Sequence, residues 1–199
     1  QFKQAVQELM AQGATGLIFD LRGNGGGLVD AAAQMLDYLL PAGDIISATY
    51  ADGTTEVLHT SDAAEISLPM AVLTNERTAS AAELFAAAIR DYNKGVLMGE
   101  KTYGKGVMQR TYPLSDGSTV KFTIAAFNPP SGINFNGVGL TPDLKITLTD
   151  AQKKHFYMLS DAEDPVIAAA VAWVETGEVR QNAGGGSSSS QPSGGTDPN

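Results

Sequence analysis

Short apolar segments alternate with segments of helical periodicity along most of this chain, and this alternation constrains the fold more than any other feature. Apolar runs typical of buried strands occupy residues 16–21, 70–74 and 96–99. Helical patterns occupy residues 2–13, 28–40, 80–92 and 165–175. Two further pairs of segments, 45–50 with 54–59 and 107–113 with 119–127, are predicted β-hairpins. Strands that alternate with helices, together with hairpins, predict a layered α/β domain.

The charge and the residue types exclude several classes of function. The chain has 199 residues with 13 Lys and Arg against 22 Asp and Glu, so its formal net charge is −9. Because the sequence has no basic cluster, nucleic acid and anionic membrane surfaces are not expected as partners. The absence of cysteine excludes disulfides, thiol nucleophiles and thiolate metal ligands. No apolar run approaches the roughly 18–20 residues that a membrane-spanning helix requires.

The composition changes near Asn182, where the chain becomes rich in glycine and serine. Residues 183–199 are predicted to be a disordered tail, because burial of such residues cannot offset the entropy of ordering them. Residues 1–182 are predicted to form one domain. The chain begins with Gln1 rather than Met and has no signal-peptide pattern, which indicates a processed or excised piece.

The first segment that could carry chemistry is Asp20-Leu-Arg-Gly-Asn-Gly-Gly-Gly27, which follows a predicted buried strand. Its glycines allow positive φ, so that backbone N–H groups can converge on an anion. A phosphate loop is one interpretation, but no Gly-Lys-Ser/Thr follows and the dinucleotide-binding spacing is not met. A tight turn between strand and helix is the structural alternative.

The second segment contains Ser80, at the point where a predicted strand and loop give way to a helix. There its hydroxyl would lie at the positive end of the helix dipole, beside the N–H of Ala81. This placement suits a nucleophile whose transition state develops an oxyanion. Ser80-x-x-Glu83 is also a capping box, in which the serine only closes the first helical turn. The residue types alone leave both interpretations open.

The third segment contains Lys105, which lies between two glycines just before an apolar strand, so its ammonium could be drawn toward a cleft. A lysine that is desolvated in this way loses its charge and can act as a general base. Lys101 is predicted to be solvated. His59 and His155 are predicted to be surface residues, so a Ser-His-Asp triad has little support.

Taken in order, the three segments resemble the tail-specific or C-terminal processing peptidases, the S41 serine peptidases with a Ser-Lys catalytic pair. Lys105 follows Ser80 by 25 residues and Gln109 follows it by 29, which agrees with the spacing in that family. The motifs cover about residues 1–150. They are Asp20-x-Arg22-x-Asn24-x-Gly26-Gly27, Thr78-Ala-Ser-Ala-Ala-Glu83, Gly104-Lys105-Gly106, Asp116-Gly117-Ser118, Pro130-x-Gly132 and Gly137-Val-Gly-Leu-Thr-Pro-Asp143.

The resemblance implies a role for each matching residue. Ser80 matches the nucleophile, Lys105 the general base and Gln109 the residue that orients the lysine. The N–H of Ala81, with a glycine amide of the Gly25–Gly27 turn that we assign to Gly26, matches the oxyanion hole. No metal and no cofactor are implied. The implied fold is the crotonase-like α/β superfold shared with the Clp protease, a layered core here extended by β-hairpins.

The expected function is therefore a serine endopeptidase that cleaves proteins near apolar C-termini. The expected partners are protein or peptide substrates, an upstream PDZ domain that captures the C-terminus of the substrate, and a second copy of the chain in a homo-oligomer. Members of this family act mostly outside the cytoplasm, in the periplasm, the cell envelope or the plastid lumen.

Two alternatives use the same fold without this reaction. One is a non-catalytic module that binds apolar ligands or peptides, as the retinoid-binding repeats of the retina do. The other is an acyl-CoA enzyme of the crotonase type, which would leave the spacing of Ser80 and Lys105 unexplained.

Overall fold

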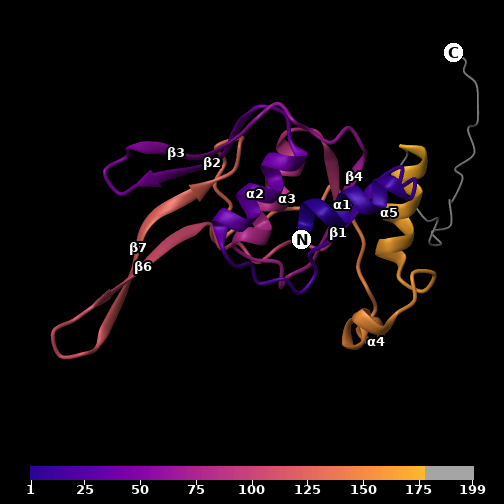
Figure 1. Ribbon diagram of the computed structural model, residues 1–199. Helices are drawn as coiled ribbons and strands as arrows, with labels where there is room; N and C mark the ends of the chain where they lie inside the picture. The colour runs from indigo at the N-terminus through magenta and orange to yellow at the C-terminus, as the bar shows by residue number, and fades with distance from the viewer. Residues whose placement is uncertain (178–199) are drawn as a thin grey trace, which may run out of the picture.

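Two four-stranded sheets form the framework of the computed structural model, which describes residues 1–177 (Figure 1). One sheet is parallel, in the order β1-β4-β5-β8, and the other is antiparallel, in the order β3-β2-β7-β6. The predicted mixed α/β class is confirmed. In chain order the elements are α1 (Phe2–Ala11), β1 (Leu17–Asp20), α2 (Val29–Leu39), β2 (Gly43–Tyr50), β3 (Thr55–Ser61), β4 (Met70–Thr74), α3 (Ala81–Asp91), β5 (Gly95–Gly99), β6 (Val107–Pro113), β7 (Thr119–Asn128), β8 (Leu144–Lys145), α4 (Asp150–Lys154), the 3-10 helix η1 (Phe156–Met158) and α5 (Pro165–Thr176).

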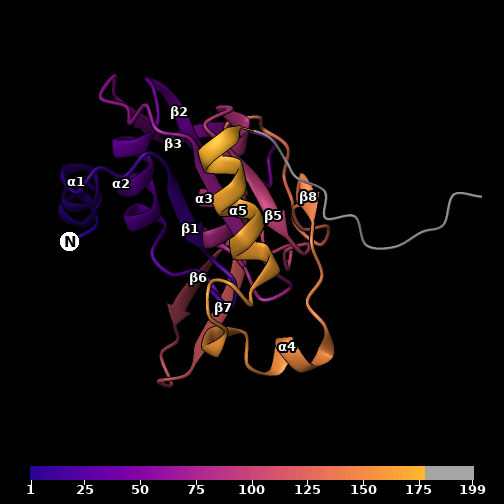
Figure 2. The same cartoon turned by 90° about the vertical axis from the view of Figure 1, so that its right-hand side faces the viewer.

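Strand β4 lies inside the parallel sheet, and all five of its residues are buried. Successive side chains of a strand point to opposite faces. Met70 and Val72 accordingly join the hydrophobic core formed with α2 and α3, whereas Ala71 and Leu73 join a second cluster formed with α5. Figure 2 shows α5 lying across the sheet. Helices therefore cover both faces, which explains why the strands of this sheet read as continuous apolar runs.

The antiparallel sheet consists of two hairpins that are joined by the pairing of β2 with β7. Both hairpins extend from the body of the molecule on the side away from α5 (Figure 1). The turn of the β6–β7 hairpin is closed by Asp116, whose Oδ1 accepts hydrogen bonds from the N–H of Ser118 at 3.0 Å and from its hydroxyl at 2.6 Å. Strand β6 begins two residues after Lys105, so the hairpin continues directly from the loop that carries the candidate base.

The elements expected from the sequence match the observed ones within a few residues, but β8, α4 and η1 were not predicted. Strand β8 has two residues and is defined by its parallel pairing with Met98 and Gly99 of β5, a contact that no local pattern encodes. The predicted tail, residues 183–199, and the last five residues of the predicted domain lie outside the described residues. Within residues 1–177 no helix is long and apolar enough to cross a membrane.

Candidate functional site

Ser80 occupies the turn between β4 and α3, where it is the N-cap residue of α3. Its backbone has φ 60° and ψ −123°, and among the described residues only Asn93 is another non-glycine with positive φ. Such a conformation costs about 1–3 kcal/mol and persists only where surrounding contacts enforce it. A strained turn from strand to helix presents a serine side chain beside the first free amide of the helix, which here is the N–H of Ala81.

The carboxylate of Glu83 holds this turn in place. Glu83 is fully buried, and its Oε2 accepts hydrogen bonds from the N–H of Ser80 at 2.9 Å and from the N–H of Lys105 at 2.8 Å. Its Oε1 accepts from the hydroxyl of Thr102 at 2.5 Å and from the N–H of Gly104 at 2.7 Å. One carboxylate therefore joins the turn of the candidate nucleophile to the loop of the candidate base.

The sequence assigned Glu83 only to a capping box, and its bond to the N–H of Ser80 is part of that box. The other bonds come from residues 19 to 22 positions later in the chain and were not predicted. A glutamate in the first turn of a helix rich in alanine was the signal that could have pointed to them, because a buried carboxylate requires several donors. The capping role and the functional role of this motif are therefore compatible.

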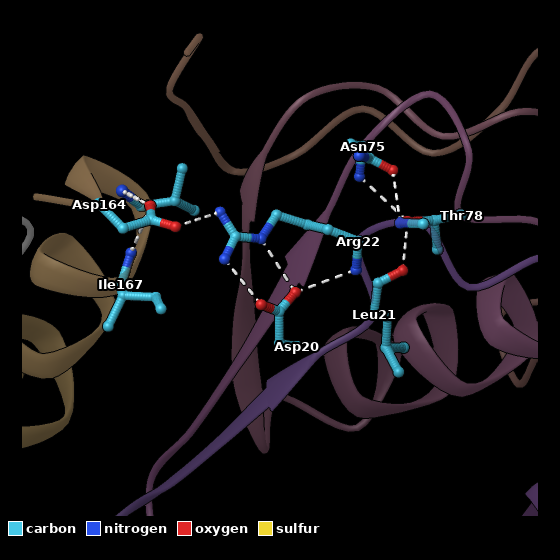
Figure 3. Close-up of polar contacts among 9 residues, drawn as sticks. Asp20, Leu21, Arg22, Asn75, Thr78, Asp164 and Ile167 are labelled. Carbon is cyan, nitrogen blue, oxygen red and sulfur yellow. Dashed lines mark hydrogen bonds and ion pairs between the residues drawn. The ribbon is translucent and has the colours of Figure 1, made fainter. Parts of the chain in front are cut away.

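The glycine-rich segment forms a tight turn that is tied to the loop before Ser80 (Figure 3). The hydroxyl of Thr78 donates to the carbonyl oxygen of Leu21 at 2.8 Å, and the N–H of Gly23 donates to Oδ1 of Asn75 at 2.9 Å. Because these bonds run from one loop to the other, the two turns are held as one unit at the carboxyl ends of β1 and β4.

Gly26 lies directly against the Ser80 turn. Its φ is +90°, and a Cβ atom on it would lie 2.6 Å from the carbonyl oxygen of Ala79 and 2.9 Å from the nitrogen of Ala81. Only glycine adopts this positive φ without strain and also lacks the Cβ atom that would clash with the Ser80 turn. The N–H of Gly26 donates to Oδ1 of Asn24 at 2.9 Å, so in this structure that amide is used within its own turn.

The side chains of Lys105 and Gln109 are exposed. In the described part of the chain no hydrogen bond joins the Ser80 hydroxyl to Lys105 Nζ. The Lys105 side chain, whose ammonium could be drawn toward a cleft, is thus exposed in this structure, while its backbone N–H is bound by the buried carboxylate of Glu83. Lys101 is exposed, as predicted.

Neither histidine is bonded to Ser80 within residues 1–177. His59 Nε2 lies 3.3 Å from Oδ1 of Asp30, and the His59 side chain is 30% exposed. His155 is exposed at the end of α4. Over the same residues no group of three or more His, Asp and Glu side chains is arranged to hold a metal ion.

An apolar cavity of about 250 Å³ opens beside Gly26 and Ala81. Apart from Asn24, its lining consists of apolar residues and glycines, which come from α1, β1, the glycine turn, α2 and α3. Its largest side chains are Phe2, Phe19, Leu21, Leu28, Met35 and Phe85. This cavity suits an apolar side chain of a ligand whose backbone lies at the Ser80 turn.

Comparisons with known sequences agree with one another. Residues 1–146 match the model of peptidase family S41. The C-terminal processing peptidase, chloroplastic, of Tetradesmus obliquus is 38% identical over 146 residues, which are 72% of this chain and 31% of that protein. The carboxy-terminal processing protease CtpA of Bacillus subtilis is 38% identical over 154 residues, 77% of this chain and 33% of that protein. The chain spans about a third of the length of these relatives.

Solved structures show the same relation. The photosystem II D1 C-terminal processing protease superposes with a TM-score of 0.69 and 36% identity, covering 82% of this chain and 44% of that chain. Mature CPAF superposes with a TM-score of 0.71 over 89% of this chain and 47% of that chain, but at 15% identity it is informative about the fold alone.

Proposed function

The chain belongs to peptidase family S41, and we propose that it is a serine endopeptidase domain in which Ser80 is the nucleophile and Lys105 the general base. The observation that carries the proposal is the Glu83 carboxylate, which binds the backbone N–H groups of both residues. The names of the relatives, C-terminal processing peptidase and protease, support peptide-bond hydrolysis as the reaction.

In the proposed reaction the neutral amine of Lys105 accepts the hydroxyl proton of Ser80 as Oγ attacks a substrate carbonyl carbon. The ammonium so formed protonates the leaving amine, and an acyl-enzyme results. Water then attacks the acyl carbon, losing a proton to Lys105, and the carboxylate product leaves as Ser80 regains its proton. Gln109 orients the lysine. This chemistry requires about 2.6–3.5 Å between Ser80 Oγ and Lys105 Nζ, so the exposed lysine side chain must turn toward Ser80 while its backbone stays in place.

The proposed oxyanion hole consists of the N–H of Ala81 and a glycine amide of the adjacent turn. The Ala81 amide is the first of an 11-residue helix, where the helix dipole favours negative charge. Gly26 is our choice for the second donor because its backbone lies against Ala81. Its N–H would then have to be shared with, or released from, Asn24.

The apolar cavity supports a substrate whose attacked carbonyl follows an apolar side chain. We propose, from the family resemblance, that this bond lies near the C-terminus of a protein. We further propose that an upstream PDZ domain captures that C-terminus, that the chain acts outside the cytoplasm as a homo-oligomer, and that its layered core is of the crotonase-like type. These proposals rest on the family resemblance.

A non-catalytic module that binds apolar peptides is the second candidate function. Two observations favour this candidate. Binding of an apolar peptide requires an apolar cavity, and it does not require the side chain of Lys105 to approach Ser80. The two functions differ in whether bound peptide is cleaved.

The test is Ser80→Ala in the full-length protein that contains this domain, incubated with an unstructured protein and followed by mass spectrometry of the fragments. We expect hydrolysis to disappear while the free energy of unfolding falls by at most about 1 kcal/mol, the usual cost of a lost cap. Hydrolysis that survives the substitution would refute the nucleophile. Tight binding of apolar peptides without cleavage by the unaltered protein would instead establish the binding module.

A further inference from the structure

Asp164, the N-cap residue of α5, is a fully buried carboxylate on the side of the parallel sheet away from α3. Its Oδ1 accepts hydrogen bonds from the N–H of Val166 at 2.9 Å and from the N–H of Ile167 at 3.3 Å. Its Oδ2 accepts from Nη1 of Arg22 at 2.7 Å. As Figure 3 shows, the carboxylate caps its helix with one oxygen and reaches across to Arg22 with the other.

Each nitrogen of the Arg22 guanidinium donates a hydrogen bond to a carboxylate oxygen. Its Nε donates to Oδ1 of Asp20 at 2.9 Å, and its Nη2 donates to Oδ2 of Asp20 at 2.6 Å. The ring of Phe156 lies 5.2 Å from Arg22 Cζ, and only 3% of the arginine side chain is exposed. Burial alone would lower the pKa of Arg22, but the hydrogen bonds of Asp20 and Asp164 outweigh it and raise the pKa. The arginine is therefore permanently charged, and its bonded nitrogens join Asp20 to Asp164.

The backbone of Arg22 leads straight into the glycine turn. Its own N–H donates to Oδ1 of Asp20 at 3.0 Å, and the next amide, of Gly23, is bound by Asn75. Four residues after Arg22, Gly26 lies against the nitrogen of Ala81. Oδ1 of Asp20 thus accepts from both the backbone N–H and Nε of Arg22, which connects the ion pair to the start of the glycine turn.

Packing alone does not require this link. Helix α5 packs on β1, β4 and β5, where Val166 and Ala170 are buried in the cluster of that face. A buried ion pair is weak support for stability, because desolvation of the two charges offsets their attraction. The link also lies partly beyond residues 1–146, the part of the chain that matches the family model.

We propose that Asp164 is a positioning residue for peptide-bond hydrolysis, which, through Arg22, sets the glycine turn against Ser80 and Ala81. This inference rests on the proposed function. The segment of the chain after residue 146 thereby contributes to the geometry of the oxyanion hole without touching the substrate.

Asp164→Asn in the full-length protein tests the proposal. Asparagine keeps the size and a helix-capping oxygen, but it turns an N–H donor toward the Arg22 donor. Arg22→Lys is the second variant, because it keeps the charge but cannot bind both carboxylates as a fork. Ala170→Gly is the matched control, since it destabilises the same helix without touching the ion pair.

Two measurements are made on each variant that folds, as judged by circular dichroism. One is the exchange rate of the Gly23 and Gly26 amides, both of which are hydrogen-bonded in the turn. The other is kcat and KM for a peptide with an apolar residue before the cleaved bond. We expect about tenfold faster amide exchange and a kcat about 10–100-fold lower with KM within about twofold, as for a misplaced oxyanion donor. Ala170→Gly should change neither.

Unchanged exchange and unchanged kcat in both ion-pair variants would overturn the proposal, as would equal effects in Ala170→Gly. If the unaltered protein cleaves nothing but the two glycine amides still respond to Asp164→Asn, the link between helix and turn stands and the proposed function fails. The two failures are thereby distinguished.

Discussion

The burial of the Glu83 carboxylate shows how one residue can determine two loops. An ionised carboxylate without partners is very unfavourable in a protein interior. Here four donors compensate it, and they are the N–H groups of Ser80, Gly104 and Lys105 and the hydroxyl of Thr102. Because hydrogen bonds to a charged group contribute about 1.5–3 kcal/mol each, the strained φ of Ser80 is easily maintained by this arrangement.

Glu83→Gln should therefore impair both folding and activity. A glutamine presents one oxygen and one NH₂ group, so in either orientation the NH₂ group faces at least one backbone N–H donor. We expect the free energy of unfolding to fall by about 2–4 kcal/mol and kcat/KM to fall about 100-fold or more. Glu163→Gln is the control, because Glu163 accepts from Ser160 in the same Ser-x-x-Glu pattern at the surface. Comparable losses in both variants would contradict the role of Glu83.

Lys105→Arg distinguishes a general base from a structural cation. Arginine keeps the positive charge but cannot lose its proton in the working range, so hydrolysis should vanish while the melting temperature stays within about 2 °C. Lys101→Arg, at an exposed position of the same loop, should leave kcat unchanged. Equal loss of activity in the two variants would mean that the loop, and not the lysine, is what matters.

At the scale of elements, the β6–β7 hairpin connects the Lys105 loop to the antiparallel sheet. The register of β6 against β7 is irregular between Met108 and Gln109. The extra residue lies on β7, because the successive β6 residues Met108 and Gln109 pair with Ala125 and Thr123. A bulge bends its own strand and increases the local twist, so the hairpin changes direction beside Gln109.

The far end of this hairpin should loosen in acid. Hydrogen bonds from the Ser118 hydroxyl and from the Ser118 N–H lower the pKa of Asp116 in the folded protein. The ionised carboxylate therefore stabilises the folded turn fully above its unfolded pKa of about 4. This stabilisation is lost as the pH falls through the lower pKa of the folded state. The amide of Ser118, followed by NMR, should shift in that range and stay constant in Asp116→Asn. A wild-type turn that is unchanged down to pH 2 would contradict this account.

At the scale of the whole molecule, the two faces of the parallel sheet serve different purposes. Helices α1, α2 and α3 lie on one face and, with β1 and the glycine turn, enclose the apolar cavity beside Gly26. Helix α5 covers the other face and reaches the same turn through Asp164 and Arg22 (Figures 1 and 2). The Ser80 turn lies where these two halves meet, at the carboxyl end of β4.

Ala31→Trp tests whether the cavity receives the substrate. Ala31 is exposed and lines the cavity, so a larger side chain there should narrow the cavity without straining the core. For peptides with a large apolar residue before the cleaved bond, we expect kcat/KM to fall about tenfold or more. For peptides with alanine before that bond, kcat/KM should change little. Gln34→Trp, exposed on the same helix but outside the cavity, is the control. Equal effects on both peptides would argue against this subsite.

The sequence by itself determined the order and the type of nearly all elements, because burial on one or both faces leaves a periodic record in each segment. Its resemblance to the S41 family also singled out Ser80, Lys105, Gln109 and the glycine turn. Only the tertiary structure decided how these segments are joined. Glu83 binds residues 19 to 22 positions away, and Arg22 binds Asp164 across 142 positions. Such pairings depend on how loops and helices are brought together in space, and no local pattern of apolar and polar residues specifies them.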